Sequence, residues 1–149
     1  MPARRLRMIC LSAGLLFAAS ALAQEGHPAK GTWVGDWGPT SAQRNRIVLL
    51  MDWDGKSITG FLNPGPNAVP LRIVRLDITP GNPSTKPPTD PTFKVHIEAG
   101  TKDAKGNPVN IVADGTMQEV ALPNRAIAGT WTQTSGGNAV KGEFKIKRQ

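Results

Sequence analysis

The chain has 149 residues, of which 39% are hydrophobic and 19% are charged, and its formal charge is +7. This length fits one domain that is large enough to bury a core. The basic residues are scattered, apart from a short run at 141–148 that we interpret as the solvated face of a last strand, and tyrosine is absent. A nucleic-acid partner, which needs clustered positive charge beside stacking aromatic residues, is therefore not expected.

Residues 1–23 have the layout of a secretory signal peptide. Arg4, Arg5 and Arg7 precede an apolar run at 8–22, and an Ala-Leu-Ala site ends at Ala23, directly before Gln24. The apolar run is short for a membrane-spanning helix, although an uncleaved anchor is the alternative. We therefore expect a periplasmic or secreted protein that has no integral membrane segment after signal removal.

Removal of this segment changes the chemistry of the chain. The three arginines leave with it, which lowers the formal charge from +7 to +4, and Cys10, the single cysteine, leaves as well. The mature chain can then form no disulfide and has no thiolate nucleophile. Its stability must come from the packed core.

Residues 24–30 are polar and predict a flexible leader, and 31–149 predict a single β domain. Within that domain apolar residues alternate with polar ones, as in Phe93, Lys94 and Val95, which is the pattern of strands with one buried face. No stretch shows helical periodicity over three turns. The expected strands are 31–37, 46–53, 58–62, 69–78, 93–99, 109–117, 126–134 and 140–147.

Sequence patterns also predict a hairpin, a bulge and two loops. Asp54-Gly55 lies between two strand-like runs and predicts a hairpin. In the fourth strand the phase of the alternation is ambiguous, which indicates a bulge between Arg72 and Arg75. The segments 63–67 and 79–91 are rich in proline, so they predict loops, and the length of the second loop is typical of function or mobility.

Eight short strands in simple order predict an all-β, antiparallel up-and-down meander that closes into a small barrel. Closure removes the exposed edges that invite aggregation, and an eight-stranded barrel is either filled by side chains or holds one small ligand. A two-sheet sandwich is the alternative architecture.

Two motifs resemble those of small exported calycin-type barrels, the relatives of avidin and the lipocalins. A first strand with Gly-x-Trp, here Gly31 and Trp33, is followed in those families by a hydrophobic-x-Gly-aromatic pattern. The residues that match the second pattern are Ile58, Gly60 and Phe61, and again Ile127, Gly129 and Trp131. The resemblance implies a ligand-binding barrel, but tyrosine and the lipocalin cysteines are missing, so biotin binding is not carried over.

The four tryptophans are the first candidate site. Trp33, Trp37, Trp53 and Trp131 could form an aromatic box for a flat ligand or a sugar ring. The alternative, which we favour, is that three of them fill the core and that Trp37, at a strand end, lies at a rim.

Three polar residues are further candidates. His96 and Glu98 lie two apart on one strand face and could form an acid/base pair or two metal ligands, but Lys94 on the same face favours a solvated charged stripe. Asp52 could act with Asp54 as paired carboxylates, although turn capping is the commoner role. No catalytic or zinc motif is present, so we assign no catalytic residue, metal or cofactor.

These observations lead to one functional expectation and two alternatives. We expect an exported, non-enzymatic barrel that binds a small molecule or an envelope protein at an open end lined by Trp37 and the proline-rich loops. The alternatives are a small periplasmic hydrolase that uses His96 with Glu98 or Asp52, and a structural envelope module without a small-molecule ligand.

Overall fold

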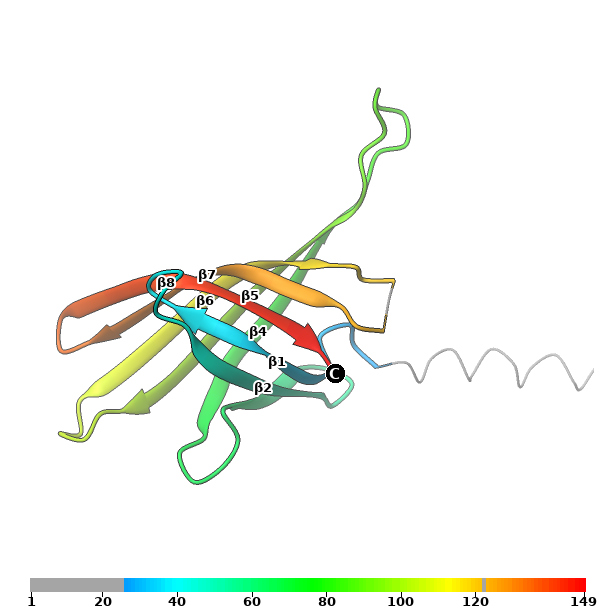
Figure 1. The fold of residues 1–149 in the computed structure, drawn as a ribbon. Helices are drawn as coiled ribbons and strands as arrows, with labels where there is room; N and C mark the ends of the chain where they lie inside the picture. The colour runs from blue at the N-terminus through cyan, green and yellow to red at the C-terminus, as the bar shows by residue number, and fades with distance from the viewer. Residues whose placement is uncertain (1–25, 122) are drawn as a thin grey trace, which may run out of the picture.

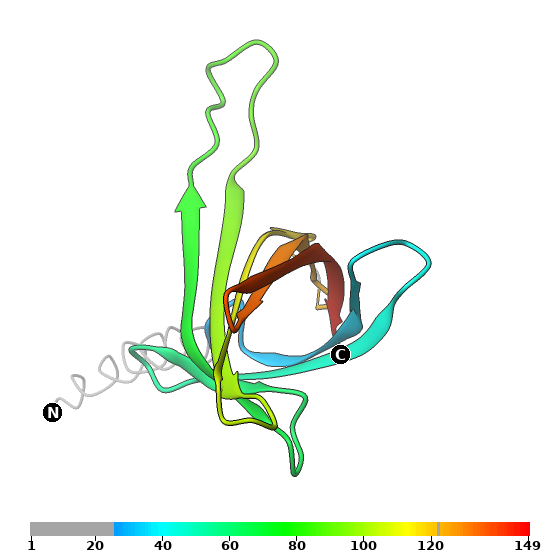
Figure 2. The ribbon, with the colours of Figure 1, turned by 90° about the vertical axis from the view of Figure 1, so that its left-hand side faces the viewer.

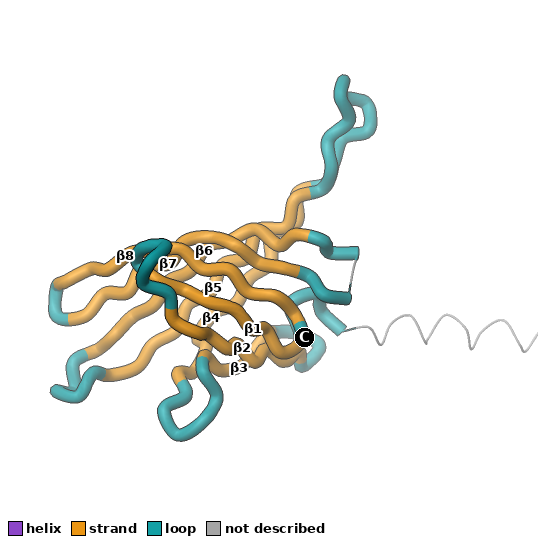
Figure 3. The backbone as a smooth tube through the Cα atoms, in the orientation of Figure 1, coloured by secondary structure: helices purple, strands orange, loops and turns teal. Residues whose placement is uncertain are grey.

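The computed structural model describes residues 26–121 and 123–149, so the expected signal peptide lies outside the described residues. Eight antiparallel strands follow one another around a closed barrel, and no helix occurs in the described part (Figures 1 and 3). The predicted up-and-down barrel is confirmed, and the sandwich is not formed. The strands are β1 (Gly31–Gly38), β2 (Asn45–Trp53), β3 (Ile58–Leu62), β4 (Val69–Thr79), β5 (Thr92–Lys102), β6 (Pro108–Gln118), β7 (Ala126–Ser135) and β8 (Asn138–Arg148).

The alternation of side chains fills the barrel interior. Val95, Met51 and Ile127 are fully buried, as are Trp33 and Ile146, and they belong to one cluster to which every strand contributes a buried or half-buried apolar side chain. Fully burying a side chain of this size stabilises the fold by about 1.5–3 kcal/mol. A packed core therefore stabilises a chain whose single cysteine can form no intramolecular disulfide.

Glycines let the strands approach closely in the region of Phe144. A Cβ atom at Gly35 would clash with the main-chain oxygen of Lys145, and one at Gly129 would clash with that of Asp114. Gly129 lies opposite Phe144 in the β7–β8 register. The missing side chain thus allows close strand contact beside a large aromatic ring.

The alternating strand direction sorts the loops between two ends of the barrel (Figure 1). The terminal end carries the start of β1, the end of β8, and the loops 54–57, 80–91 and 119–125. The opposite end, which we call the far end, carries the loops 39–44, 63–68, 103–107 and 136–137.

A turn before β1 packs against the terminal end. The Lys30 amide donates a hydrogen bond to the His27 carbonyl at 2.8 Å, and Ala29 is fully buried. The Trp33 indole donates a hydrogen bond to the Ala29 carbonyl at 2.8 Å, and Arg125 donates one to the Pro28 carbonyl at 3.0 Å. Residues 27–30 therefore form a turn whose buried Ala29 completes the core, and residues 24 and 25 of the expected leader lie outside the described residues.

The hairpin of β4 and β5 extends away from the barrel as an arm (Figure 2). The register shifts between Leu71 and Ile73, which confirms the predicted bulge. The connecting loop has internal order, with a bridge between Asn82 and Thr89. β3 and β4 share only two registered pairs, so these two strands diverge toward the terminal end.

Candidate functional site

Two of the four tryptophans belong to the core. Trp33 is fully buried, and Trp131 is 6% exposed, with its indole donating a hydrogen bond to the Glu143 carbonyl at 3.2 Å. Trp37 is half-buried near the far end and packs edge-on against Trp131, with ring centroids 4.4 Å apart. This pair lines the interior where β1 and β7 approach the far end.

Trp53 lies at the other end of the barrel. Its ring is 4.8 Å from that of His27, and burial lowers the pKa of His27. The tryptophans are thus divided between two ends and do not form one box. The expected open end needs a correction for the same reason, because Trp37 shares the far end with the loop 63–68, whereas the long proline-rich loop 80–91 belongs to the terminal end.

Asp52 and Asp54 stabilise local structure. The Asp54 carboxylate accepts hydrogen bonds from the Ser57 and Lys56 amides, both at 2.7 Å, and these bonds lower its pKa. Asp52 accepts from the Trp53 amide at 2.9 Å and lies 3.2 Å from the Lys30 ammonium, and both interactions lower its pKa. Both carboxylates therefore hold a turn or a strand end.

His96 lies between two carboxylates on the outer face of the barrel. Its Nε2 atom is 3.0 Å from Glu98 on the same strand, and its Nδ1 atom is 2.7 Å from Asp114 on β6. Glu98 and then Asp114 raise the pKa of His96, whose side chain is 18% exposed. The positive imidazolium is the form that can donate to both carboxylates, so the cluster joins β5 to β6.

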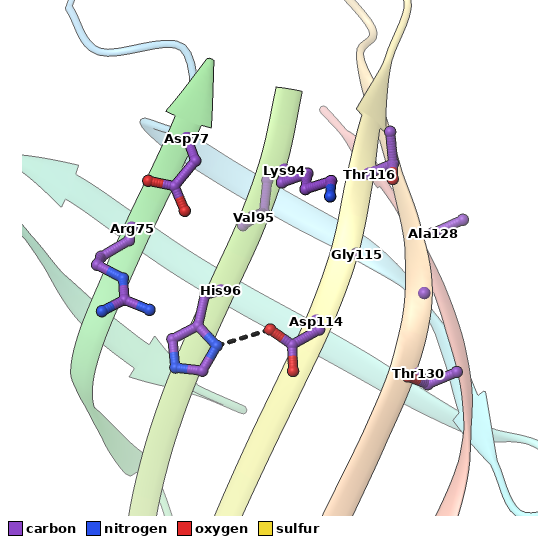
Figure 4. A pocket seen from close by; sticks show the side chains of 11 residues that line it. Arg75, Asp77, Lys94, Val95, His96, Asp114, Gly115, Thr116, Ala128 and Thr130 are labelled. Atoms are coloured by element: carbon purple, nitrogen blue, oxygen red, sulfur yellow. Dashed lines mark hydrogen bonds and ion pairs between the residues drawn. The ribbon is translucent and has the colours of Figure 1, made fainter. Parts of the chain in front are cut away.

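An open hollow of about 460 Å³ lies beside His96 and Asp114 of this cluster, on the outside of the barrel (Figure 4). Its floor includes the outer side of the main chain at Gly115 and Gly129, which pair with the buried Val95 and Phe144 and so face the interior, and the small side chain of Ala128. The polar lining comes from four strands: Arg75 and Asp77 of β4, Lys94 and His96 of β5, Asp114 and Thr116 of β6, and Thr130 of β7. We call this site the outer hollow.

Several charges in the outer hollow are not neutralised at close range. In the β4–β5 register Arg75 lies opposite His96, and Asp77 lies opposite Lys94. Within the described residues, the ion pairs closer than 4.0 Å include neither Arg75, nor Asp77, nor Lys94. These side chains are therefore able to interact with a ligand or another protein.

Both ring nitrogens of His96 are occupied within the cluster. A catalytic histidine directs one ring nitrogen to a nucleophile or substrate, whereas both nitrogens of His96 contact carboxylates. In the described part of the chain, no group of three or more His, Cys, Asp or Glu residues is arranged to hold a metal ion. The cluster is suited to binding and to joining two strands.

Sequence reasoning did not identify Asp114 and Arg75 as members of the site. Lys102 pairs with Pro108 across the loop 103–107, and this register brings His96 opposite Asp114. The Asp103 carboxylate shapes that turn by accepting hydrogen bonds from the Lys105 and Asn107 amides at 2.8 and 2.9 Å. Counting outward from the turn would have found Asp114, whereas Arg75 also required the position of the bulge.

The chain was compared with known proteins. No family model matches it, and neither a curated protein nor a solved structure does. The eight-stranded closed barrel is compatible with the calycin-type resemblance. Among the described residues, no helix is long and apolar enough to cross a membrane.

Proposed function

We propose that this chain is an exported, non-enzymatic binding domain that takes its ligand at the outer hollow. The observation that carries the proposal is the position of the hollow, which lies outside a barrel whose interior is packed with apolar side chains. Charges of both signs and hydroxyl groups line it, above a floor of small residues. This chemistry fits a polar ligand that carries both charge signs, such as a peptide or a peptide-like segment of an envelope protein.

We expect this function in the periplasm or outside the cell, after export of the chain. The proposal rests on the arginines, the apolar run and the small-residue site of residues 1–23. A peptide ligand is available there from the envelope and its proteins. The structural module without a ligand is the second candidate, because the packed core is what that alternative expects.

Amide and indole NMR signals can test where a ligand binds. Amino acids, dipeptides and tripeptides, and sugars would be titrated into the ¹⁵N-labelled mature protein. We expect a peptide-class compound to shift the amides of Lys94, Thr116 and Thr130 saturably, while the Trp37 and Trp131 indole signals stay in place. Thr130→Arg, which fills the hollow from an exposed position, should abolish the shifts, whereas Lys141→Asp on the outer face of β8 should not.

Two outcomes would contradict this proposal. Shifts centred on the Trp37 and Trp131 indoles would place the ligand in the barrel interior and restore the original expectation of an open-end site. No shift with any compound, and no crosslink in the envelope from a photoreactive residue at position 130, would favour the structural module.

A further inference from the structure

One long stretch of β4 has an open edge. β3 pairs with β4 only through Phe61 with Pro70 and Leu62 with Val69. In the described residues, every registered pair of β4 from Leu71 to Thr79 is made with β5, on the other side. Figure 2 shows this hairpin leaving the barrel, so the edge of β4 that faces away from β5 is uncovered along the arm.

The open edge is able to pair with another strand. Pro70 and Pro80 flank it, but no proline lies between them, so the alternate residues whose main-chain groups point away from β5 all retain a donor as well as an acceptor. The side chain of Arg72 turns away across β5, where it lies over Gly100 and donates a hydrogen bond to Asn110 of β6 at 2.8 Å. The bulge at Leu71 to Ile73 and Pro80 limit the usable stretch to 73–79.

The side-chain pattern along this stretch is complementary to itself. The residues Val74, Arg75, Leu76, Asp77 and Ile78 alternate apolar and charged side chains around Leu76. When a second copy pairs antiparallel about a two-fold axis at Leu76, Arg75 of each copy lies opposite Asp77 of the other. The same operation brings Val74 opposite Ile78, so charges meet opposite charges and apolar side chains meet apolar ones.

The environment of Arg75 and Ile78 favours this arrangement. Within one chain Arg75 lies opposite His96, whose contacts with Glu98 and Asp114 raise its pKa. When His96 is positive, it is an unfavourable neighbour for an arginine. Ile78 is 56% exposed, on the apolar side of the arm. A second copy supplies an acid to Arg75 and covers Ile78 with Val74.

From these observations we propose that the protein forms a two-fold symmetric homodimer in which residues 73–79 of β4 pair antiparallel with the same residues of a second copy. The sheet then continues from one barrel into the next. Because each copy offers the same edge to the other, the contact closes as a dimer and does not propagate into a fibre. The proposal does not rest on a ligand at the outer hollow, although the dimer contact uses Arg75 and Asp77, which also line that hollow.

Charge reversal tests the predicted contact by measuring the dimer dissociation constant in analytical ultracentrifugation. We expect the full mature protein to be dimeric, and Arg75→Asp or Asp77→Arg alone to raise the dissociation constant by about tenfold or more, because both symmetric ion pairs become like-charge pairs. The double variant R75D/D77R should dimerise again, and an equimolar mixture of the two single variants should form a heterodimer. Lys141→Asp on β8 is the matched control and should leave the dissociation constant unchanged.

Cysteine crosslinking tests the register. In the mature protein, which lacks Cys10, Leu76→Cys should form an intermolecular disulfide, because opposite Cα atoms in an antiparallel pair lie about 4.5–5.5 Å apart, within the range of a disulfide. Val74→Cys alone should not, because the two copies of residue 74 would be about 14 Å apart. A mixture of Val74→Cys and Ile78→Cys should crosslink.

Several results would overturn the proposal. A protein that stays monomeric at all concentrations would contradict the homodimer. An extended segment of another protein would then be the candidate that pairs with the β4 edge. A dimer whose dissociation constant does not change with either charge reversal would form through another surface. A dimer that crosslinks through Val74→Cys alone would pair in another register.

Discussion

His96 lies between two carboxylates, and this arrangement has a consequence for stability. The contacts raise the pKa of His96 in the folded protein above the value of about 6.5 that it has in an unfolded chain. A raised pKa stabilises the folded state fully below the unfolded pKa, and this contribution disappears as the pH rises through the folded pKa. Because Asp114 and Glu98 are 67% and 37% exposed, we expect an effect of about 0.2–1 kcal/mol.

Urea unfolding of the wild type and of His96→Gln, at pH 5.5 and pH 8.5, measures this effect. The free energy of unfolding should fall on substitution at pH 5.5, and the difference should shrink at pH 8.5. His27→Gln is a useful contrast, because burial lowers the pKa of His27 and its removal should favour the folded state more at the lower pH. A difference between wild type and His96→Gln that does not depend on pH would contradict an imidazolium held by carboxylates.

Single side chains were also where prediction from sequence was weakest. The alternation of apolar and polar residues predicted that His96 and Glu98 share a face, because this depends only on strand geometry. The contact with Asp114 depends on how two strands are aligned, which a local pattern does not contain. The buried position of Ala29 could not be predicted either, because the segment before β1 is polar and only the core behind it explains its order.

The turn before β1 is an element that the barrel depends on. It supplies the acceptors for the Trp33 indole and for Arg125, and it buries Ala29 at the terminal end. A chain that begins at Lys30 should therefore be less stable than a chain that begins at Gly26. We expect a loss of about 2 kcal/mol, from one or two hydrogen bonds and the apolar area that becomes exposed.

Denaturant unfolding measures that loss, and acrylamide quenching reports the change at Trp33. The shorter chain should show a red-shifted emission and a higher quenching constant, because water reaches an indole that is otherwise fully buried. Equal stability and equal quenching of the two chains would mean that the turn is not part of the folded core.

Whole elements were predicted well where hydrophobic periodicity was clear. All eight strands lie where the alternation placed them, and the ambiguous phase in the fourth strand marked a true bulge. The divergence of β3 from β4 was not predicted, because nothing in the alternation of β4 distinguishes a strand paired on two sides from one paired on a single side. Closure removes most edges of this barrel, yet the arm retains one.

At the scale of the molecule, the remaining edge makes stability depend on concentration. If two copies cover each other's β4 edge, the folded dimer is favoured over the unfolded chains by mass action, so the melting temperature should rise with protein concentration. A hundredfold rise within the dimeric range should add about 1 kcal/mol per protomer, or about 3–5 °C for a domain of this size. Calorimetry of Arg75→Asp over the same concentration range should give a constant melting temperature. The β4 edges of two such copies place acidic side chains opposite each other, so this variant should stay monomeric. A constant melting temperature for both proteins would show that the barrel gains nothing from a second copy.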